Sequence, residues 1–181
     1  MRLFVLPSKR LARLQRGNAK ALTDLEQKAG VEIFIQADSD GESTIEIDGD
    51  SEKEWLAEQA LKAIDLGFEP KHAFKIFNDD YYLEEVDLGL SMRGKDSAVA
   101  RVKARIIGTG GKVKKKVEEL SEAYLALSDD QRVGIIGEFD EVKAAKEAVI
   151  RIIEGSQHAS VFDYLKKEKD LRKSRRLGAA V

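Results

Sequence analysis

Two short apolar stretches in the second half of the chain, residues 123–127 and 133–136, flank the polar sequence Ser128-Asp129-Asp130-Gln131. Alternation in the first stretch and the apolar run of the second predict strands that pair as an antiparallel hairpin. Before the hairpin, apolar residues recur at helical spacing on both sides of a glycine-rich turn, and after it they predict a helix over residues 140–153. With an opening strand over about residues 83–90, the predicted order is β-α-α-β-β-α.

The first half of the chain repeats this pattern. At an offset of 88 residues, residues 45–49 align with residues 133–137, and apolar positions of the following helix align as well. An opening strand is predicted over residues 3–6, and Ser51 and Glu54 have the spacing of a capping box at the start of the last helix. The chain is therefore predicted to be a diverged duplication, and each copy an α+β unit with a three-stranded antiparallel sheet and three helices on one face.

The glycine-rich turn of the second copy is Gly108-Thr109-Gly110-Gly111, with Ile107 before it and Lys112 after it. This sequence resembles the I-G-x-x-G core of a type I KH domain, an RNA-binding module. Glycines allow tight backbone dihedrals and the close approach of a phosphate, and the helix that follows directs its free amides and positive dipole end at that phosphate. Residues 93–116 contain nine basic residues and one acidic residue, which favours binding to a nucleic-acid backbone.

We therefore predict an RNA-binding site made of the turn, the basic residues around it and an apolar groove floor. Its residues are Arg101, Lys103, Arg105, Ile107, Gly108, Thr109, Gly110, Gly111, Lys112, Lys114, Lys115, Leu125 and Leu127. The floor is implied by the resemblance, which places Ile107, the aliphatic part of Lys114, Leu125 and Leu127 under the bases. Lys114 departs from the family pattern, because an aliphatic residue is usual three places after the last glycine.

The equivalent turn in the first copy, Arg16-Gly17-Asn18-Ala19, lacks both framing glycines. This copy is therefore predicted to have lost the phosphate-binding turn, although the basic residues Lys9, Arg10, Arg13 and Arg16 remain. Residues 1–90 have a net charge of −8 and residues 91–181 of +6, so the two copies are predicted to differ in role. Tyr81 and Tyr82 are interpreted as part of an acidic connector between them.

Two other readings of the glycine turn compete with RNA binding. A nucleotide-binding P-loop needs Ser or Thr after the lysine, and here Val113 follows Lys112. A helix-capping turn without a ligand is common for an isolated Gly-x-x-Gly. The duplicated KH-like order and the local positive charge favour RNA over both.

Composition excludes several kinds of chemistry. The chain has no cysteine and only two histidines, His72 and His158, so thiolate zinc sites and cysteine nucleophiles are excluded and a histidine metal cluster is disfavoured. We expect no enzyme activity, metal or cofactor. No apolar run reaches the length of a membrane span, and we expect a cytoplasmic protein. The high content of charged residues, 35%, is typical of heat-adapted proteins.

The C-terminal segment is predicted to be a basic helix that packs weakly through Val161, Tyr164, Leu165 and Leu171. The expected domains are residues 1–80, a degenerate KH-like domain, residues 81–157, a KH domain with the glycine turn, and residues 158–181, the basic helix and tail.

Read together, the degenerate first copy, the sequences R-I-I-G-T-G-G-K, I-I-G-E-F and I-I-E-G-S, and the basic C-terminal helix resemble the archaeal form of the Partner-of-Nob (Dim-two) family. The resemblance implies a small-subunit ribosome-assembly factor that binds single-stranded rRNA, or its precursor, near the 3′ end of the small-subunit RNA. It also implies, as protein partners, the endonuclease that processes that end or a translation initiation factor. A protein-interaction scaffold with weak RNA binding is the alternative.

Overall fold

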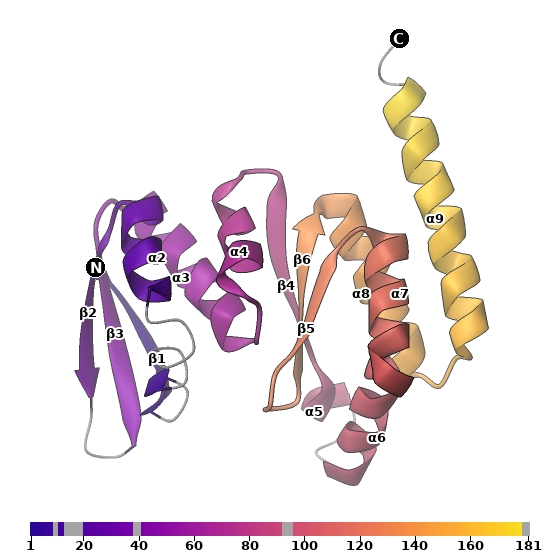
Figure 1. The fold of residues 1–181 in the computed structure, drawn as a ribbon, viewed down its shortest axis with the longest axis horizontal. Helices are drawn as coiled ribbons and strands as arrows, with labels where there is room; N and C mark the ends of the chain where they lie inside the picture. Colours follow the sequence, from indigo (N-terminus) through magenta and orange to yellow (C-terminus); the bar gives the residue numbers. More distant parts are fainter. Residues whose placement is uncertain (9–10, 13–19, 38–40, 92–95, 179–181) are drawn as a thin grey trace. The chain divides into compact units, whose positions relative to one another are not determined.

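The computed structural model describes residues 1–8, 11–12, 20–37, 41–91 and 96–178. The chain divides into two compact units, residues 1–78 and residues 79–181. Figure 1 gives the labels of the helices and strands. Each unit is built on its own antiparallel sheet, so the expected α+β fold with antiparallel sheets is confirmed.

The first unit contains a three-stranded sheet in the order β1-β3-β2. Its elements are β1 (Arg2–Pro7), α2 (Ala21–Ala29), β2 (Glu32–Ala37), β3 (Glu42–Asp48), α3 (Ser51–Asp65), α4 (Pro70–Ala73) and the 3₁₀ helix η1 (Phe74–Phe77). Residues that alternate along β1 and β3 point toward α2 and α3, where Leu6, Leu25, Ile45, Ile47 and Leu61 form the core. The opposite face of this sheet exposes Leu3, Val5 and Phe34.

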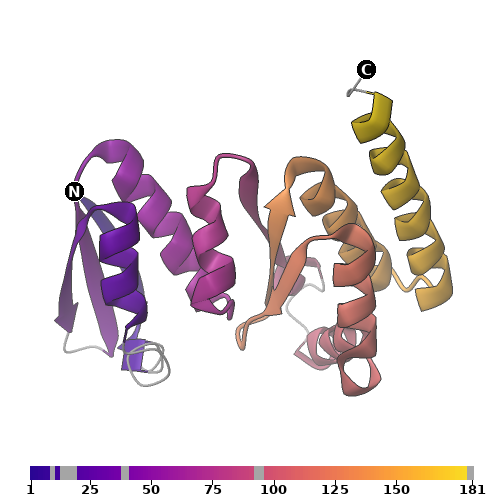
Figure 2. The ribbon, with the colours of Figure 1, turned by 45° about the horizontal axis from the view of Figure 1, so that its top comes forward.

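The second unit repeats the strand order as β4-β6-β5. Its elements are β4 (Tyr81–Asp87), α5 (Leu88–Ser91), α6 (Asp96–Ile107), the 3₁₀ turn η2 (Thr109–Gly111), α7 (Lys112–Ser121), β5 (Tyr124–Leu127), β6 (Arg132–Glu138), α8 (Phe139–Ile153) and α9 (His158–Gly178). As Figure 2 shows, α7 and α8 lie on one face of the sheet, and α9 lies against these helices rather than against the sheet.

The predicted hairpin is confirmed. β5 and β6 pair antiparallel, with Leu125 opposite Ile135 and Leu127 opposite Val133. The opening strand of this unit begins earlier than expected, at Tyr81 instead of about residue 83. Tyr81 and Tyr82 therefore belong to the sheet, opposite Glu138 and Gly137, and the interpretation of these tyrosines as a connector is wrong.

The capping box predicted at Ser51 and Glu54 is not formed. Helix α3 has Asp50 as its N-cap, so Ser51 is already helical, and the Glu54 carboxylate accepts from the Gly49 N–H and pairs with the Met1 ammonium. A capping box does occur at α8, where Glu138 and Glu141 each accept from the other's backbone N–H. It fixes the corner between β6 and α8.

The C-terminal helix packs more firmly than its sequence predicts. Val161 and Leu165 are fully buried in the core of the second unit, and Arg172 is almost as buried. Leu171, expected on the packed face, is half exposed instead. The buried face of α9 therefore includes a cation, which a count of apolar residues misses.

Candidate nucleic-acid interface

The glycine turn joins α6 to α7 through three residues with positive φ. Gly108 has φ 70° and ψ 174°, Gly110 has φ 59° and Gly111 has φ 75°. Residues with a side chain rarely adopt these conformations. The Gly108 N–H donates to the Ala104 carbonyl and ends α6, and the Gly111 N–H donates to the Gly108 carbonyl at 3.1 Å. The turn thus has a defined shape that depends on its glycines.

The three glycines of the turn have different roles. A Cβ at Gly108 would lie 2.3 Å from Cγ2 of Val113, so glycine is needed there for close packing of the turn on α7. At Gly110 and Gly111, no described atom lies within 4 Å of an added Cβ. The space in front of Gly110 and Gly111 is therefore open to a ligand, at the N-terminus of a ten-residue helix.

The basic residues around the turn fall into three groups. Arg101, Lys112 and Lys115 are exposed and make no ion pair with another described residue. Lys114 pairs with Glu118 at 3.2 Å and Lys116 with Glu119 at 3.0 Å. The first group has the uncompensated charge that a phosphate backbone attracts. Arg93 and Lys95, counted in the basic stretch, lie outside the described residues.

Lys103 and Arg105 bind backbone carbonyls of their own unit. The Lys103 ammonium donates to the Ser128 carbonyl at 2.6 Å. The Arg105 guanidinium donates to the Ile152 carbonyl at 2.8 Å and the Ser156 carbonyl at 2.6 Å, at the C-terminus of α8, where a cation is stabilised by the helix dipole. Because these contacts hold α6 in place, we leave both residues out of the proposed RNA contacts.

The expected apolar floor is also revised. Ile107 is 39% exposed and able to contact a base, but Leu125 is 3% exposed and part of the core, so the expectation for Leu125 is corrected. Leu127 is partly buried against the same core. Between α7 and β5, Oε1 of Glu118 accepts from the Leu125 N–H at 2.8 Å and contacts Lys114. An ion pair thus occupies the place where the family pattern has an aliphatic residue.

The corresponding turn of the first copy, residues 16–19, lies outside the described residues, as do Lys9, Arg10 and Arg13. Lys20, which aligns with Lys112, is exposed immediately before α2. The loss of the phosphate-binding turn in this copy therefore stays a prediction from sequence.

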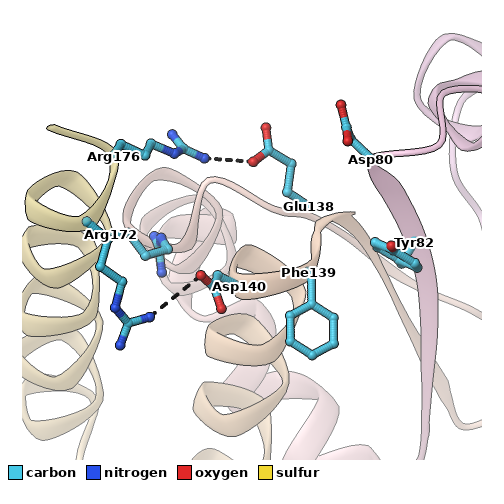
Figure 3. Close-up of a pocket in the computed structure, with 8 residues that line it drawn as sticks. Asp80, Tyr82, Glu138, Phe139, Asp140, Arg172 and Arg176 are labelled. Carbon is cyan, nitrogen blue, oxygen red and sulfur yellow. Dashed lines mark hydrogen bonds and ion pairs between the residues drawn. The ribbon is translucent and has the colours of Figure 1, made fainter. Parts of the chain in front are cut away.

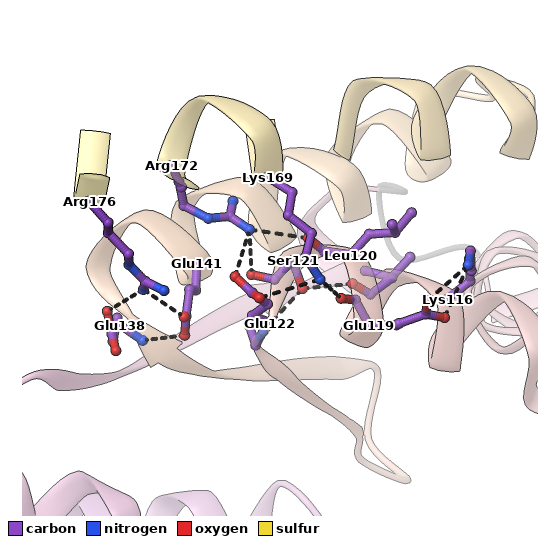
Figure 4. A network of polar contacts seen from close by, with 12 residues as sticks. Lys116, Glu119, Leu120, Ser121, Glu122, Glu138, Glu141, Lys169, Arg172 and Arg176 are labelled. Atoms are coloured by element: carbon purple, nitrogen blue, oxygen red, sulfur yellow. Dashed lines mark hydrogen bonds and ion pairs between the residues drawn. The ribbon is translucent and has the colours of Figure 1, made fainter. Parts of the chain in front are cut away.

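The far end of α7 is held by α9 through contacts that the sequence did not reveal. Arg172 Nη2 donates to the carbonyls of Leu120 and Ser121 at 3.1 and 3.0 Å, and Lys169 donates to the Glu119 carbonyl at 2.9 Å (Figure 4). These carbonyls end α7, so the two cations also oppose its negative dipole end. The only sequence signal is the spacing of Lys169, Arg172 and Arg176, which recur on one face of α9.

Replacing Arg172 by Met should lower the free energy of unfolding by about 2 kcal/mol, because the buried carbonyls of Leu120 and Ser121 lose a charged donor. Glu122 lies 3.6 Å from Arg172 and also pairs with Lys169, so it keeps an ion-pair partner in the variant. This remaining ion pair limits the loss of stability. Urea denaturation measures the change. The exposed neighbour Lys173 provides the control, since Lys173→Met should change stability by less than about 0.5 kcal/mol. A fully stable Arg172→Met would contradict the capping role.

Neither a metal site nor a membrane span is found in the described part of the chain. No group of histidine, aspartate and glutamate side chains there has the arrangement of a metal centre. None of the helices there combines the length and apolar character needed to cross a membrane.

Residues 82–170, which include the turn, match the family model for the second KH domain of PNO1, described as a eukaryotic type KH domain (KH domain type I). The KH domain-containing protein MJ0443 of Methanocaldococcus jannaschii is 34% identical over 160 residues, which cover 86% of this chain and 67% of the relative. The pre-rRNA-processing protein PNO1 of Coccidioides immitis is 31% identical over 60% of this chain. The chain spans less than half of that relative's length, 43%.

Two solved structures from Pyrococcus horikoshii share the fold. The structure of Dim2p has a TM-score of 0.77 and 31% identity and covers 92% of this chain and 99% of its own. The structure of an a/eIF2alpha-aDim2p-rRNA complex has a TM-score of 0.78 and 30% identity and covers 93% of this chain and 94% of its own. The likeness thus extends over both units.

Proposed function

Because the chain belongs to the Partner-of-Nob (Dim-two) family, with PNO1 and Dim2p among its relatives, we propose that it binds single-stranded small-subunit rRNA through the Gly108–Gly111 turn. The open space at Gly110 and Gly111, in front of the N-terminus of α7, is the observation that carries the proposal. Ile107, Thr109 and Lys112 adjoin it in the chain, Lys115 lies on the first turn of α7, and Arg101 lies on α6 before the turn. A KH turn of this kind contacts about four nucleotides of backbone.

We also infer that both units are type I KH domains, the first a degenerate copy over residues 1–80, the second over residues 81–157, with residues 158–181 as a C-terminal helix and tail. The shared strand order of the two sheets supports this. The helix α9 then serves the second domain as a support of α7.

The names of the relatives indicate the target and the partners. PNO1 of Coccidioides immitis is named a pre-rRNA-processing protein, and the relative from Pyrococcus horikoshii was solved with rRNA and a/eIF2alpha. We propose that this chain likewise acts by binding rather than catalysis, in the assembly or processing of the small ribosomal subunit near its rRNA 3′ end. The partners we propose are the translation factor subunit and the processing endonuclease.

A protein-interaction scaffold is the second candidate function. It is favoured by the apolar strip of Leu3, Val5 and Phe34 on the outer face of the first sheet, since solvent-facing apolar patches often bind proteins. The two functions differ in whether RNA binding depends on the glycine turn.

The salt dependence of RNA affinity tests the first function. With three unpaired cations at the site, the slope of log affinity against log salt should be about −2, and affinity should fall roughly 20-fold between 50 and 200 mM salt. Lys112→Gln should make the slope shallower by about 0.7. Lys116→Gln removes a lysine that is paired with Glu119 and should leave the slope unchanged. Fluorescence anisotropy with an rRNA 3′-end oligonucleotide measures it, and a flat response would refute electrostatic binding at the turn.

A further inference from the structure

A pocket of about 270 Å³ lies in the second unit, where the start of β4, the N-terminus of α8 and one face of α9 meet (Figure 3). Its lining residues are Asp80, Tyr82, Glu138, Phe139, Asp140, Arg172, Arg175 and Arg176. None of them belongs to the proposed RNA site, so the pocket needs its own explanation.

Two aromatic rings form one wall of this pocket. Phe139 is 66% exposed and Tyr82 50% exposed, and the rings meet edge to face with centroids 6.2 Å apart. Phe139 occupies the first position of α8, where water does not stabilise its apolar ring, and it is not part of the hydrophobic core of the unit. An exposed aromatic pair beside a pocket is typical of a surface that another molecule covers.

The opposite wall is ionic and nearly balanced. Arg176 pairs with Glu138 at 2.8 Å and Glu141 at 3.3 Å, and Arg175 with Asp140 at 3.7 Å. The nearby Glu138 carboxylate raises the pKa of Arg176, so the guanidinium stays charged. The three arginines of the lining face three carboxylates, which gives the pocket a formal net charge of zero.

Arg172 differs from the other two arginines of the lining in its burial and in its unpaired donors. Its side chain is 3% exposed, and Nε and Nη1 have no hydrogen-bond partner among the described residues, whereas Nη2 binds the end of α7. A buried donor left unpaired costs free energy. A small movement of the Arg172 side chain would bring one of these donors to a hydrogen-bond acceptor in the pocket. The new hydrogen bond would remove the free-energy cost of the unpaired donor.

These features favour a protein over RNA or a small molecule. The lining has a formal net charge of zero and so does not attract a phosphate backbone, and the volume lies below the usual range for small-molecule sites, roughly 300–1,000 Å³. Aromatic residues and arginine are the residue types enriched at the centres of protein interfaces. The pocket therefore has the size and chemistry for an apolar side chain of a partner with a carboxylate next to it.

RNA and a protein can bind the second unit together. Gly111 precedes the first residue of α7, and Arg172 binds its last carbonyls. The ten residues of this helix separate the two sites by about 15 Å.

We propose that the pocket docks the translation initiation factor α subunit, which places an apolar side chain against Tyr82 and Phe139 and a carboxylate toward Arg172. The choice of occupant rests on the proposed function, because a relative was solved with a/eIF2alpha and rRNA together. The pocket lies apart from the turn and leaves the rRNA site free.

The test compares Phe139→Ala with Phe34→Ala, which removes a similarly exposed aromatic from the outer sheet face of the first unit. Calorimetry with the purified α subunit from the same organism measures protein affinity, and anisotropy measures RNA affinity for each variant. Alanine is a good helix former at the first position of α8, so the variant should fold, which circular dichroism checks. Phe139→Ala should weaken α-subunit binding by at least tenfold and leave RNA affinity unchanged, and Phe34→Ala should change neither.

Three outcomes would overturn the proposal. A loss of α-subunit binding in Phe34→Ala alone would place the partner on the first sheet. A loss of RNA binding in Phe139→Ala would make the pocket part of the RNA site. If the wild-type chain binds RNA but not the α subunit, the pocket proposal fails while the rRNA function stands.

Discussion

Replacing Thr109 and Gly110 by aspartate should weaken binding to single-stranded rRNA by at least 100-fold, or about 3 kcal/mol. Both positions are exposed, and a Cβ at Gly110 meets no described atom within 4 Å. The two carboxylates would therefore occupy the open space where we place a phosphate, and like charges brought together cost several kcal/mol. Anisotropy with the rRNA 3′-end oligonucleotide measures the loss.

The matched control replaces the same two residues by asparagine. Asparagine has nearly the size of aspartate and also tolerates the left-handed conformation at Gly110, so the two double variants differ in charge alone. We expect the asparagine variant to retain most of the affinity and both variants to unfold at the same urea concentration within error. Equal loss in both would mean that shape rather than charge limits binding, and no loss in either would remove the turn from the RNA site.

The architecture of the second unit was predictable because its signals are local. The polar turn between two apolar stretches sets the β5–β6 hairpin, and glycines at 108 and 111 mark the junction of two helices. These features depend on residues close in sequence. The start of β4 was missed because Tyr81 and Tyr82 follow two aspartates, and the acidic context resembled a connector.

The partners of the basic side chains were not predictable, because they come from distant parts of the chain. Arg105 binds carbonyls 47 and 51 residues away, and Arg172 binds carbonyls 52 and 51 residues away. The number of basic residues in a sequence does not show which of them donate hydrogen bonds to backbone carbonyls of the same chain. The inward face of β5 was equally hidden, because all four residues from Tyr124 to Leu127 have apolar or aromatic side chains, so the sequence does not distinguish the buried face of the strand from the exposed one.

Gly108→Ala is expected to cause the largest loss of stability, about 2–6 kcal/mol. A side chain in the conformation of Gly108 costs about 1–3 kcal/mol by itself, and overpacking against Val113 adds about 1–3 kcal/mol. Gly110→Ala is the control, because it also has positive φ but no described neighbour within 4 Å of its Cβ, and it should cost only about 1–2 kcal/mol. Urea denaturation of both variants measures the difference.

The double variant Gly108→Ala with Val113→Ala measures how much the Val113 methyl groups contribute to this loss. Removing the Val113 methyl groups removes the contact at 2.3 Å and leaves the contact with the Val113 Cβ at 2.8 Å, so the double variant should be more stable than the sum of the single changes predicts, by at least 1 kcal/mol. Strict additivity would show that the Val113 methyl groups do not contribute to the loss. Gly108→Ala should also weaken RNA binding, because it shifts the turn against α7, whereas the aspartate variant loses RNA binding with the same stability as its asparagine control. Gly108 then fixes the shape of the turn, and the exposed residues Thr109 and Gly110 border the space that the RNA occupies.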